Sequence, residues 1–94
     1  MPSPDPRIAF GRRLRELRLE RNLSQEKLAE LADVHRNYVG GVERGERNVS
    51  LVNIVKLAHG LNVSPAKLIE TIRWVEFRLR RFTRLNERLQ QKTR

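Results

Sequence analysis

The sequence predicts an all-α protein, and three observations lead to that fold class. Apolar residues recur at helical spacing, as in Phe10, Leu14 and Leu17, which lie at i, i+4 and i+7. Helix-starting signals recur along the chain, among them Asp5-Pro6 and Ser64-Pro65, each a capping residue followed by proline. The period-two alternation that is typical of half-buried strands is not seen in any stretch. We therefore expect a set of short helices and no sheet.

The composition limits the size of this fold and points to its partners. Ninety-four residues make one domain with one appendage at most. A net charge of +9 indicates a polyanionic partner, with DNA or RNA first and an anionic membrane or an acidic protein second. The absence of cysteine excludes disulfides and thiolate metal sites. No apolar run approaches the ~18 residues of a membrane span, and the opening MPSPDPRIAF lacks a signal-peptide pattern, so we expect a cytoplasmic protein.

The first two helices follow from their expected ends. Residues 1–5 are expected to form a flexible leader, and the first helix to run from there to about Arg21. Asn22 can close that helix in a left-handed conformation, with Leu23 packing back beneath it. Ser24 is then the N-cap of a second helix over residues 25–32.

The stretch QEKLAELADVHRNYVGGVER is the part around which the rest of the chain is organised. It reads as two short helices, with Leu28 and Ala32 on one face of the first and Val39 and Val42 on one face of the second. Asp33 lies at the corner between them and tolerates the left-handed backbone expected there. This pattern is typical of a DNA-binding helix-turn-helix, whose second helix enters the major groove. The alternative is an ordinary helical hairpin in an α-bundle.

Three more helices are expected after this pair. His35 or Val34 opens the third helix and Gly45 ends it, while Ser50 caps a fourth helix that Gly60 stops. Ser64-Pro65 starts the fifth. Because neither glycine nor proline occurs from residue 66 to residue 94, we expect the fifth helix to continue past Ile72, or a sixth helix to follow after a kink.

From Phe10 to about Ile69 the chain resembles the Cro/repressor-type helix-turn-helix family, often called the Xre family. The matching pieces are GRRLRELR, Leu23-Ser24-Gln25, Leu28-Ala29, Tyr38-Val39, Val42-Glu43-Arg44-Gly45, Arg47-Asn48, Leu57-Ala58 and Leu61-Asn62-Val63-Ser64. The resemblance implies an all-α, five-helix repressor-like helix-turn-helix domain over residues 6–72, followed by a C-terminal helical extension. Within the family, HRNYVGGVERGERNVSLVNI is most similar to controller proteins of restriction–modification systems, and also similar to phage repressors and DNA-binding antitoxins.

The resemblance also implies which residues meet base edges. Arg36, Asn37 and Gly41 fall at the base-contacting positions of the third helix, and His35 lies beside them, where an N-cap or phosphate neighbour is its alternative role. Arginine can bond guanine O6 and N7 together, and asparagine can do the same to adenine N6 and N7. Gly41 offers no side chain, so one usual contact is missing and the backbone can approach the DNA instead. The alternative for Arg36 and Asn37 is a solvated helix face.

Phosphate contacts are expected from residues around the reading helix. Gln25 lies at a helix N-terminus, where free N–H groups favour an anion. Tyr38 has a hydroxyl that can reach the DNA backbone, and Arg44, Arg47 and Asn48 lie on the turn after the third helix. Such contacts position the protein and carry little sequence information.

A structural ion pair between Arg15 and Glu43 is implied by the family, where the corresponding pair joins the first and third helices. We expect neither an enzyme nor a metal site or other cofactor. No nucleophile–base pair or phosphate loop is present, and the two histidines, His35 and His59, are far apart in the sequence.

The tail over residues 73–94 is expected to be a basic amphipathic helix that forms the dimer. It has eight Lys/Arg against two Glu, which is +6 of the total +9. An a/d heptad stripe begins at its start, with asparagine at one a position. Its members, at spacings of 3, 4, 3, 4 and 3, are Ile72, Val75, Leu79, Phe82, Asn86 and Leu89. The alternatives are a second, non-specific DNA contact and a helix folded back on its own domain.

Together these patterns predict a dimeric, sequence-specific regulator of transcription that binds a two-fold-related operator in double-stranded DNA and regulates its own gene. One reading helix covers too few base pairs, whereas two helices spaced by ~34 Å cover enough. The alternative is an antitoxin that binds a toxin through its tail and represses its own promoter. A toxin or RNA polymerase is the further partner that the sequence leaves open, and no membrane partner is expected.

Overall fold

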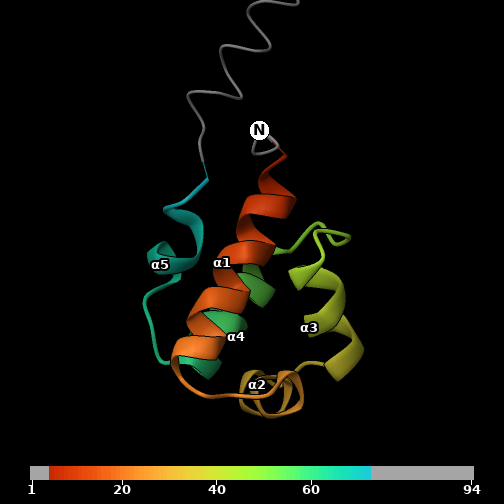
Figure 1. The fold of residues 1–94 in the computed structure, drawn as a ribbon, viewed down its shortest axis with the longest axis vertical. Coiled ribbons are helices and arrows are strands. Elements are labelled where there is room, and N and C mark those ends of the chain that lie inside the picture. The colour runs from red at the N-terminus through yellow and green to blue at the C-terminus, as the bar shows by residue number, and fades with distance from the viewer. Residues whose placement is uncertain (1–4, 73–94) are drawn as a thin grey trace, which may run out of the picture.

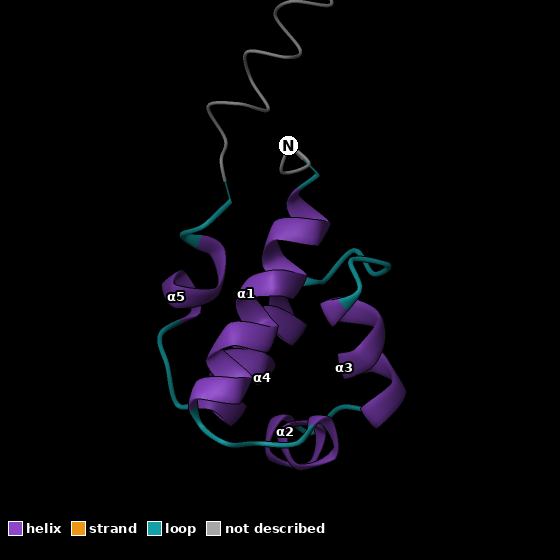
Figure 2. Ribbon diagram, in the orientation of Figure 1, coloured by secondary structure: helices purple, strands orange, loops and turns teal. Residues whose placement is uncertain are grey.

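The structure is a computed structural model that describes residues 5–72, which form five α-helices (Figure 1). The part of the chain described contains no strand, as the helix-only ribbon in Figure 2 shows, so the predicted all-α fold class is confirmed. The helices are, in chain order, α1 Pro6–Glu20, α2 Gln25–Ala32, α3 Arg36–Glu43, α4 Leu51–Leu61 and α5 Pro65–Ile69.

Each helix begins at a polar side chain that accepts a hydrogen bond from a backbone N–H of the first turn. Ser24 accepts from the N–H of Lys27 at 2.9 Å, and the other four helices begin in the same way. These contacts satisfy donors that a helix N-terminus otherwise leaves unpaired. The five N-caps are Asp5, Ser24, His35, Ser50 and Ser64.

Within residues 5–72, four helices are followed by a residue with positive φ: Gly45, with φ of 78°, follows α3, and the other three residues are not glycine. Asn22, Asp33 and Asn62 have φ of 54°, 56° and 57°. Asparagine and aspartate tolerate this region better than other side chains. The predicted left-handed conformations of Asn22 and Asp33 are therefore confirmed.

The core lies where the five helices meet. α1 runs through the middle of the view in Figure 1, with α3 on one side and α5 on the other, and α2 packs against both α3 and α4. The apolar faces predicted for the first three helices are all buried here. The buried core residues are Phe10, Leu14, Leu17, Leu28, Ala29, Ala32, Val39, Val42, Leu57, Ala58, Leu61 and Leu68.

The crossing of α1 and α3 depends on Gly11. A β-carbon at this position would overlap the carbonyl oxygen of Val42 and lie 2.8 Å from that of Glu43. Both obstacles are backbone atoms at the end of α3, so they cannot move without shifting the helix. Gly11 therefore sets how closely the third helix approaches the first.

Gly60 does not stop α4, contrary to the expectation from the sequence. The helix continues to Leu61, and Asn62 is its left-handed cap. A β-carbon at Gly60 would lie 3.0 Å from Leu28 Cδ1 and 3.1 Å from Ala32 Cβ. The glycine serves close packing of α4 on α2 rather than helix termination.

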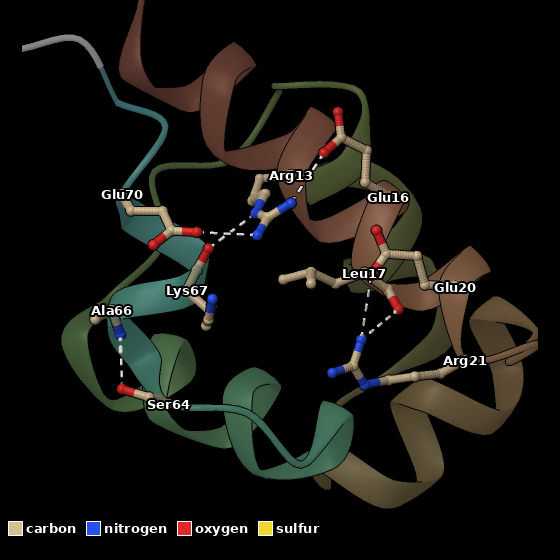
Figure 3. Close-up of polar contacts among 9 residues, drawn as sticks. All are labelled: Arg13, Glu16, Leu17, Glu20, Arg21, Ser64, Ala66, Lys67 and Glu70. Atoms are coloured by element: carbon tan, nitrogen blue, oxygen red, sulfur yellow. Dashed lines mark hydrogen bonds and ion pairs between the residues drawn. The ribbon is translucent and has the colours of Figure 1, made fainter.

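The prediction that the fifth helix continues past Ile72 is also wrong, because α5 ends at Ile69 and a turn follows. In a continuing helix, the carbonyl of Lys67 would accept from the N–H of Thr71. Here it accepts from Arg13 Nε of α1 at 3.0 Å, and Arg13 Nη2 also bonds Glu70 at 3.0 Å (Figure 3). The alternative, a sixth helix, falls on residues 73–94, outside the described residues.

Candidate nucleic-acid interface

α2, the corner at Asp33 and α3 form a helix-turn-helix. The N–H of Val34 bonds the carbonyl of Ala29 at 3.0 Å, which closes α2 through the left-handed Asp33. His35 Nδ1 then accepts from the N–H of Asn37 at 3.1 Å and starts α3. His35 therefore has the N-cap role that the sequence left open for it, while the rest of its ring stays exposed.

The first turn of α3 presents two exposed polar side chains. Arg36 and Asn37 are both exposed, whereas Val39 and Val42 on the opposite face are fully buried. Within residues 5–72, neither the Arg36 guanidinium nor the Asn37 amide makes a side-chain hydrogen bond or ion pair. Their donors and acceptors are thus available to a partner in the way that base-edge recognition requires.

Gly41 does not face outward as an open backbone surface, and that prediction is corrected. The residue is buried, and a β-carbon there would lie 3.1 Å from Arg47 Nε and 3.3 Å from Arg47 Cγ. A β-carbon at neighbouring Gly40 would lie 3.1 Å from Arg44 Nη1. The two glycines thus make room for two arginine side chains, so cationic groups from outside α3 lie where α3 has no side chains of its own.

Arg47 and Tyr38 form one cluster on this surface. The Arg47 guanidinium carbon lies 5.9 Å from the centroid of the Tyr38 ring, within the range of a cation–π contact. The Tyr38 hydroxyl accepts from Asn53 Nδ2 at 3.0 Å. Asn53 lies in the first turn of α4, and nothing in the sequence pattern singled it out, because this contact joins two helices through their tertiary packing.

Arg44, predicted to contact phosphate, already has an acidic partner. Its Nε and Nη2 donate to the two carboxylate oxygens of Glu46 at 3.0 and 3.2 Å. Hydrogen bonds from Arg44, then the charges of Arg44 and Arg47, hold the pKa of Glu46 below its ordinary value. Glu46 is therefore ionised at neutral pH, and it is a second residue of this surface that the sequence analysis missed.

The ion pair that anchors α3 uses Arg18, not Arg15. Arg18 Nε and Nη2 donate to Glu43 at 2.7 and 3.0 Å, and Arg18 Nη1 donates to the carbonyl of Leu23 at 2.8 Å. The reason for the correction is helical register. Arg18 lies four residues after buried Leu14 and shares its helix face. Arg15 directly follows Leu14, lies on another face and is exposed.

This pair is well shielded from water. The side chains of Arg18 and Glu43 are 9% and 3% exposed, and Gln25 Nε2 donates to Glu43 at 3.1 Å. One N–H of the Gln25 amide is held in this way, so its predicted phosphate contact is left to the second N–H of that amide and to the N-terminus of α2. The three side chains fix α1, α2 and α3 relative to one another.

Comparison with known proteins identifies the family. The helix-turn-helix family model HTH_3 matches residues 14–68, which include α2, α3 and the whole of α4. The chain belongs to the HTH_3 helix-turn-helix family. It is therefore a transcriptional regulator of the helix-turn-helix class, and the Xre-type resemblance is confirmed.

Relatives within the HTH_3 family are similar over most of their own length. The control protein C.BamHI of Bacillus amyloliquefaciens is 49% identical over 65 residues, which are 68% of this chain and 80% of that protein. The control protein C.SmaI of Serratia marcescens is 45% identical over 73 residues, 70% of this chain and 87% of that protein. The crystal structure of the restriction-modification controller protein C.AhdI from Aeromonas hydrophila has 61% identity and a TM-score of 0.65, covering 66% of this chain and 94% of that chain.

The described residues were also searched for a membrane-spanning helix and for a metal-binding group. Among residues 5–72, no helix is long and apolar enough to cross a membrane. No three histidine, cysteine or acidic side chains in that range are grouped so that they could hold a metal ion.

Proposed function

We propose that this protein binds a two-fold-related operator as a homodimer and regulates its own gene as the controller of a restriction–modification system. The controller role is supported by the names of the relatives, which are control proteins of that kind. The observation that carries sequence-specific reading is the exposed pair Arg36 and Asn37 at the start of a buried, well-anchored α3. The relatives named above are control proteins, so the antitoxin alternative is not carried forward.

The protein would contact its operator through two sets of residues, one at base edges and one at phosphates. Arg36 and Asn37 would meet base edges, guanine for the first and adenine for the second, with His35 beside them. Arg44, Arg47, Asn48 and Tyr38 would meet phosphates, together with the N-terminus of α2 at Gln25. Gly41 has no side chain to contact DNA, and the Arg47 side chain from the following loop covers it. The Arg47 guanidinium would therefore contact the DNA at this position.

Two surfaces could form the dimer. The stripe predicted in the tail lies outside the described residues, apart from Ile72, which is half-buried against the domain core. The second surface is on α4, where Leu51, Val52 and Val55 are 77%, 64% and 50% exposed. These three share a helix face, and burying large apolar side chains of this kind gains roughly 1.5–3 kcal/mol each.

We favour the α4 face as the interface. The α4 face lies within residues 14–68, which the family model matches, whereas the predicted tail stripe lies outside them. Asn53 of the same helix bonds Tyr38 of α3, so an interface here would hold the two reading helices in a defined relation. Since dimerisation depends on concentration, operator occupancy would follow the amount of protein, which suits autoregulation.

A footprint on the DNA upstream of the protein's own gene tests the proposed function. We expect protection of two inverted half-sites, at a protein concentration where unrelated DNA stays unprotected. Arg36→Ala is the comparison variant, because it leaves the buried face of α3 intact and should weaken the selective protection by the loss of one base contact per half-site. Uniform protection of the whole fragment by wild-type protein would contradict the proposal.

A further inference from the structure

One hydrogen bond ties the reading helix α3 to α4. Asn53 Nδ2 donates to the Tyr38 hydroxyl oxygen at 3.0 Å, and both side chains are half-buried. Among residues 5–72, no other hydrogen bond or ion pair joins these two helices. Tyr38 is the third residue of α3, so this contact holds the end of the helix that carries the exposed reading residues, whereas the ion pair of Arg18 and Glu43 holds the other end.

Both partners of this hydrogen bond are fixed in place by their own helices. The backbone N–H of Asn53 donates to Ser50 Oγ at 3.2 Å, which is the N-cap contact of α4. The Tyr38 ring packs against the buried core. The bond therefore joins two rigid elements, and the position of the Tyr38 oxygen is set by the fold.

The contact also decides how the Tyr38 hydroxyl can bond to anything else. A phenolic oxygen carries one hydrogen and can accept as well. Because Asn53 donates to that oxygen, the hydroxyl hydrogen must take another direction, away from Asn53. No group in the described part of the chain accepts a hydrogen bond from the Tyr38 hydroxyl. The hydroxyl therefore presents a donor that an external acceptor can use.

The surroundings of this donor favour an anionic acceptor. The Arg47 guanidinium carbon lies 5.9 Å from the centroid of the Tyr38 ring. The acid of the same loop, Glu46, is already paired with Arg44. A DNA phosphate oxygen is negatively charged and accepts hydrogen bonds, so one phosphate would bond the hydroxyl and be attracted by Arg47.

We propose that Asn53 is a positioning residue for DNA binding, which holds the Tyr38 hydroxyl in the orientation that donates to a phosphate. This inference rests on the phosphate contact of Tyr38 in the proposed function. Without Asn53, the hydroxyl hydrogen can also lie in the opposite direction, and the Tyr38 side chain is no longer tied to α4. Ordering it again on binding lowers the affinity. Asn53 thus strengthens DNA binding without touching the DNA.

A double-mutant cycle, measured as equilibrium binding of the full chain to an operator duplex over a range of salt, tests this proposal. Tyr38→Phe removes the hydroxyl but keeps the ring, and it should weaken binding about tenfold per subunit. Asn53→Ala should weaken binding about threefold per subunit in the wild-type background and should have no further effect in the Tyr38→Phe background. The salt slope should stay unchanged in all three variants, because none of them removes a charge.

His59→Ala is the matched control for Asn53→Ala. His59 is an exposed side chain in the last turn of the same helix, so its loss should leave the affinity unchanged. Circular dichroism and sedimentation of each variant show whether folding and oligomeric state are kept.

Two results would overturn the role of Asn53. An equal loss from Asn53→Ala in both backgrounds would show that it acts through the packing of α4 and not through the Tyr38 hydroxyl. No loss in the wild-type background would show that it does not support DNA binding. The proposed function is judged separately, from the wild-type protein: equal affinity for the operator and an unrelated duplex contradicts operator recognition, while the cycle on either duplex still tests Asn53, because every sequence offers phosphates.

Discussion

At the scale of single residues, the buried arginine of α1 follows from helical spacing and not from the position that the family resemblance implied. A Glu43 partner on α1 was expected at Arg15, but Arg18 is the residue on the buried face. Arg18, four residues after Leu14, shares the face that the spacing of Phe10, Leu14 and Leu17 marks as buried, whereas Arg15 does not. Glu46 and Asn53 escaped notice for a different reason, because their contacts form only once the loop and α4 are in place.

Arg18→Met should lower the free energy of unfolding by roughly 3–5 kcal/mol, because it leaves the carboxylate of Glu43 buried without its partner. Arg15→Met is the matched control on the same helix, and its effect should stay within about 0.5 kcal/mol because Arg15 is exposed. Urea denaturation of both variants gives the measurement. Similar losses for the two variants would contradict the assignment of Arg18 as the buried partner.

Arg36→Ala should relax the preference for one base in each half-site, at a cost of roughly 1–3 kcal/mol per contact. The reason is that Arg36 is exposed and makes no side-chain contact within the described residues that substitution could disturb. Binding to a set of operators with single base changes measures this. An equal loss on every sequence would mean that Arg36 touches only phosphate.

At the scale of elements, helix starts were predictable and helix ends less so. Ser24, Ser50 and Ser64 each begin a helix as expected, because capping depends on neighbouring residues only. The end of α5 depends instead on Arg13, far away in the sequence, which takes the Lys67 carbonyl. Glycines are ambiguous in the same way, since Gly60 looks like a stop signal but is a packing position against Leu28.

Two glycine substitutions separate backbone crowding from side-chain crowding. Gly11→Ala should destabilise the protein by at least roughly 1–3 kcal/mol, because its β-carbon meets carbonyl oxygens of α3. Gly41→Ala meets only the flexible Arg47 side chain and gains helix propensity, so the free energy of unfolding should change by about 1 kcal/mol or less. Thermal unfolding followed by circular dichroism compares them. A larger loss for Gly41→Ala than for Gly11→Ala would contradict the crossing geometry of α1 and α3.

At the scale of the whole molecule, the helix-turn-helix unit was accessible from sequence, whereas the exposed apolar face on α4 was not. The tail stripe is a clear pattern in the sequence, yet the described domain offers its own apolar surface on α4. Leu51 and Val55 look like core residues by their spacing, and only the packing of α4 on α2 shows that they face solvent. An interface must be inferred from what the fold leaves exposed.

Leu51→Asp with Val52→Asp should give a folded monomer, whereas truncation after Thr71 should leave the dimer in place. Both aspartates would stand at positions that are already exposed in the domain, so folding should survive. Sedimentation of the two proteins, with circular dichroism as the check on folding, decides between the surfaces. A monomeric truncated protein beside a dimeric double-aspartate protein would assign the interface to the tail.

The proposed reading of a two-fold operator by α3 is tested most directly by selecting bound sequences from random duplex DNA. The expected result is an enriched pair of inverted half-sites with centres about one helical turn, ~34 Å, apart. In the same selection Arg36→Ala should lose one base preference per half-site while keeping the spacing. Recovery of a single asymmetric site, or of no enriched sequence at all, would contradict it.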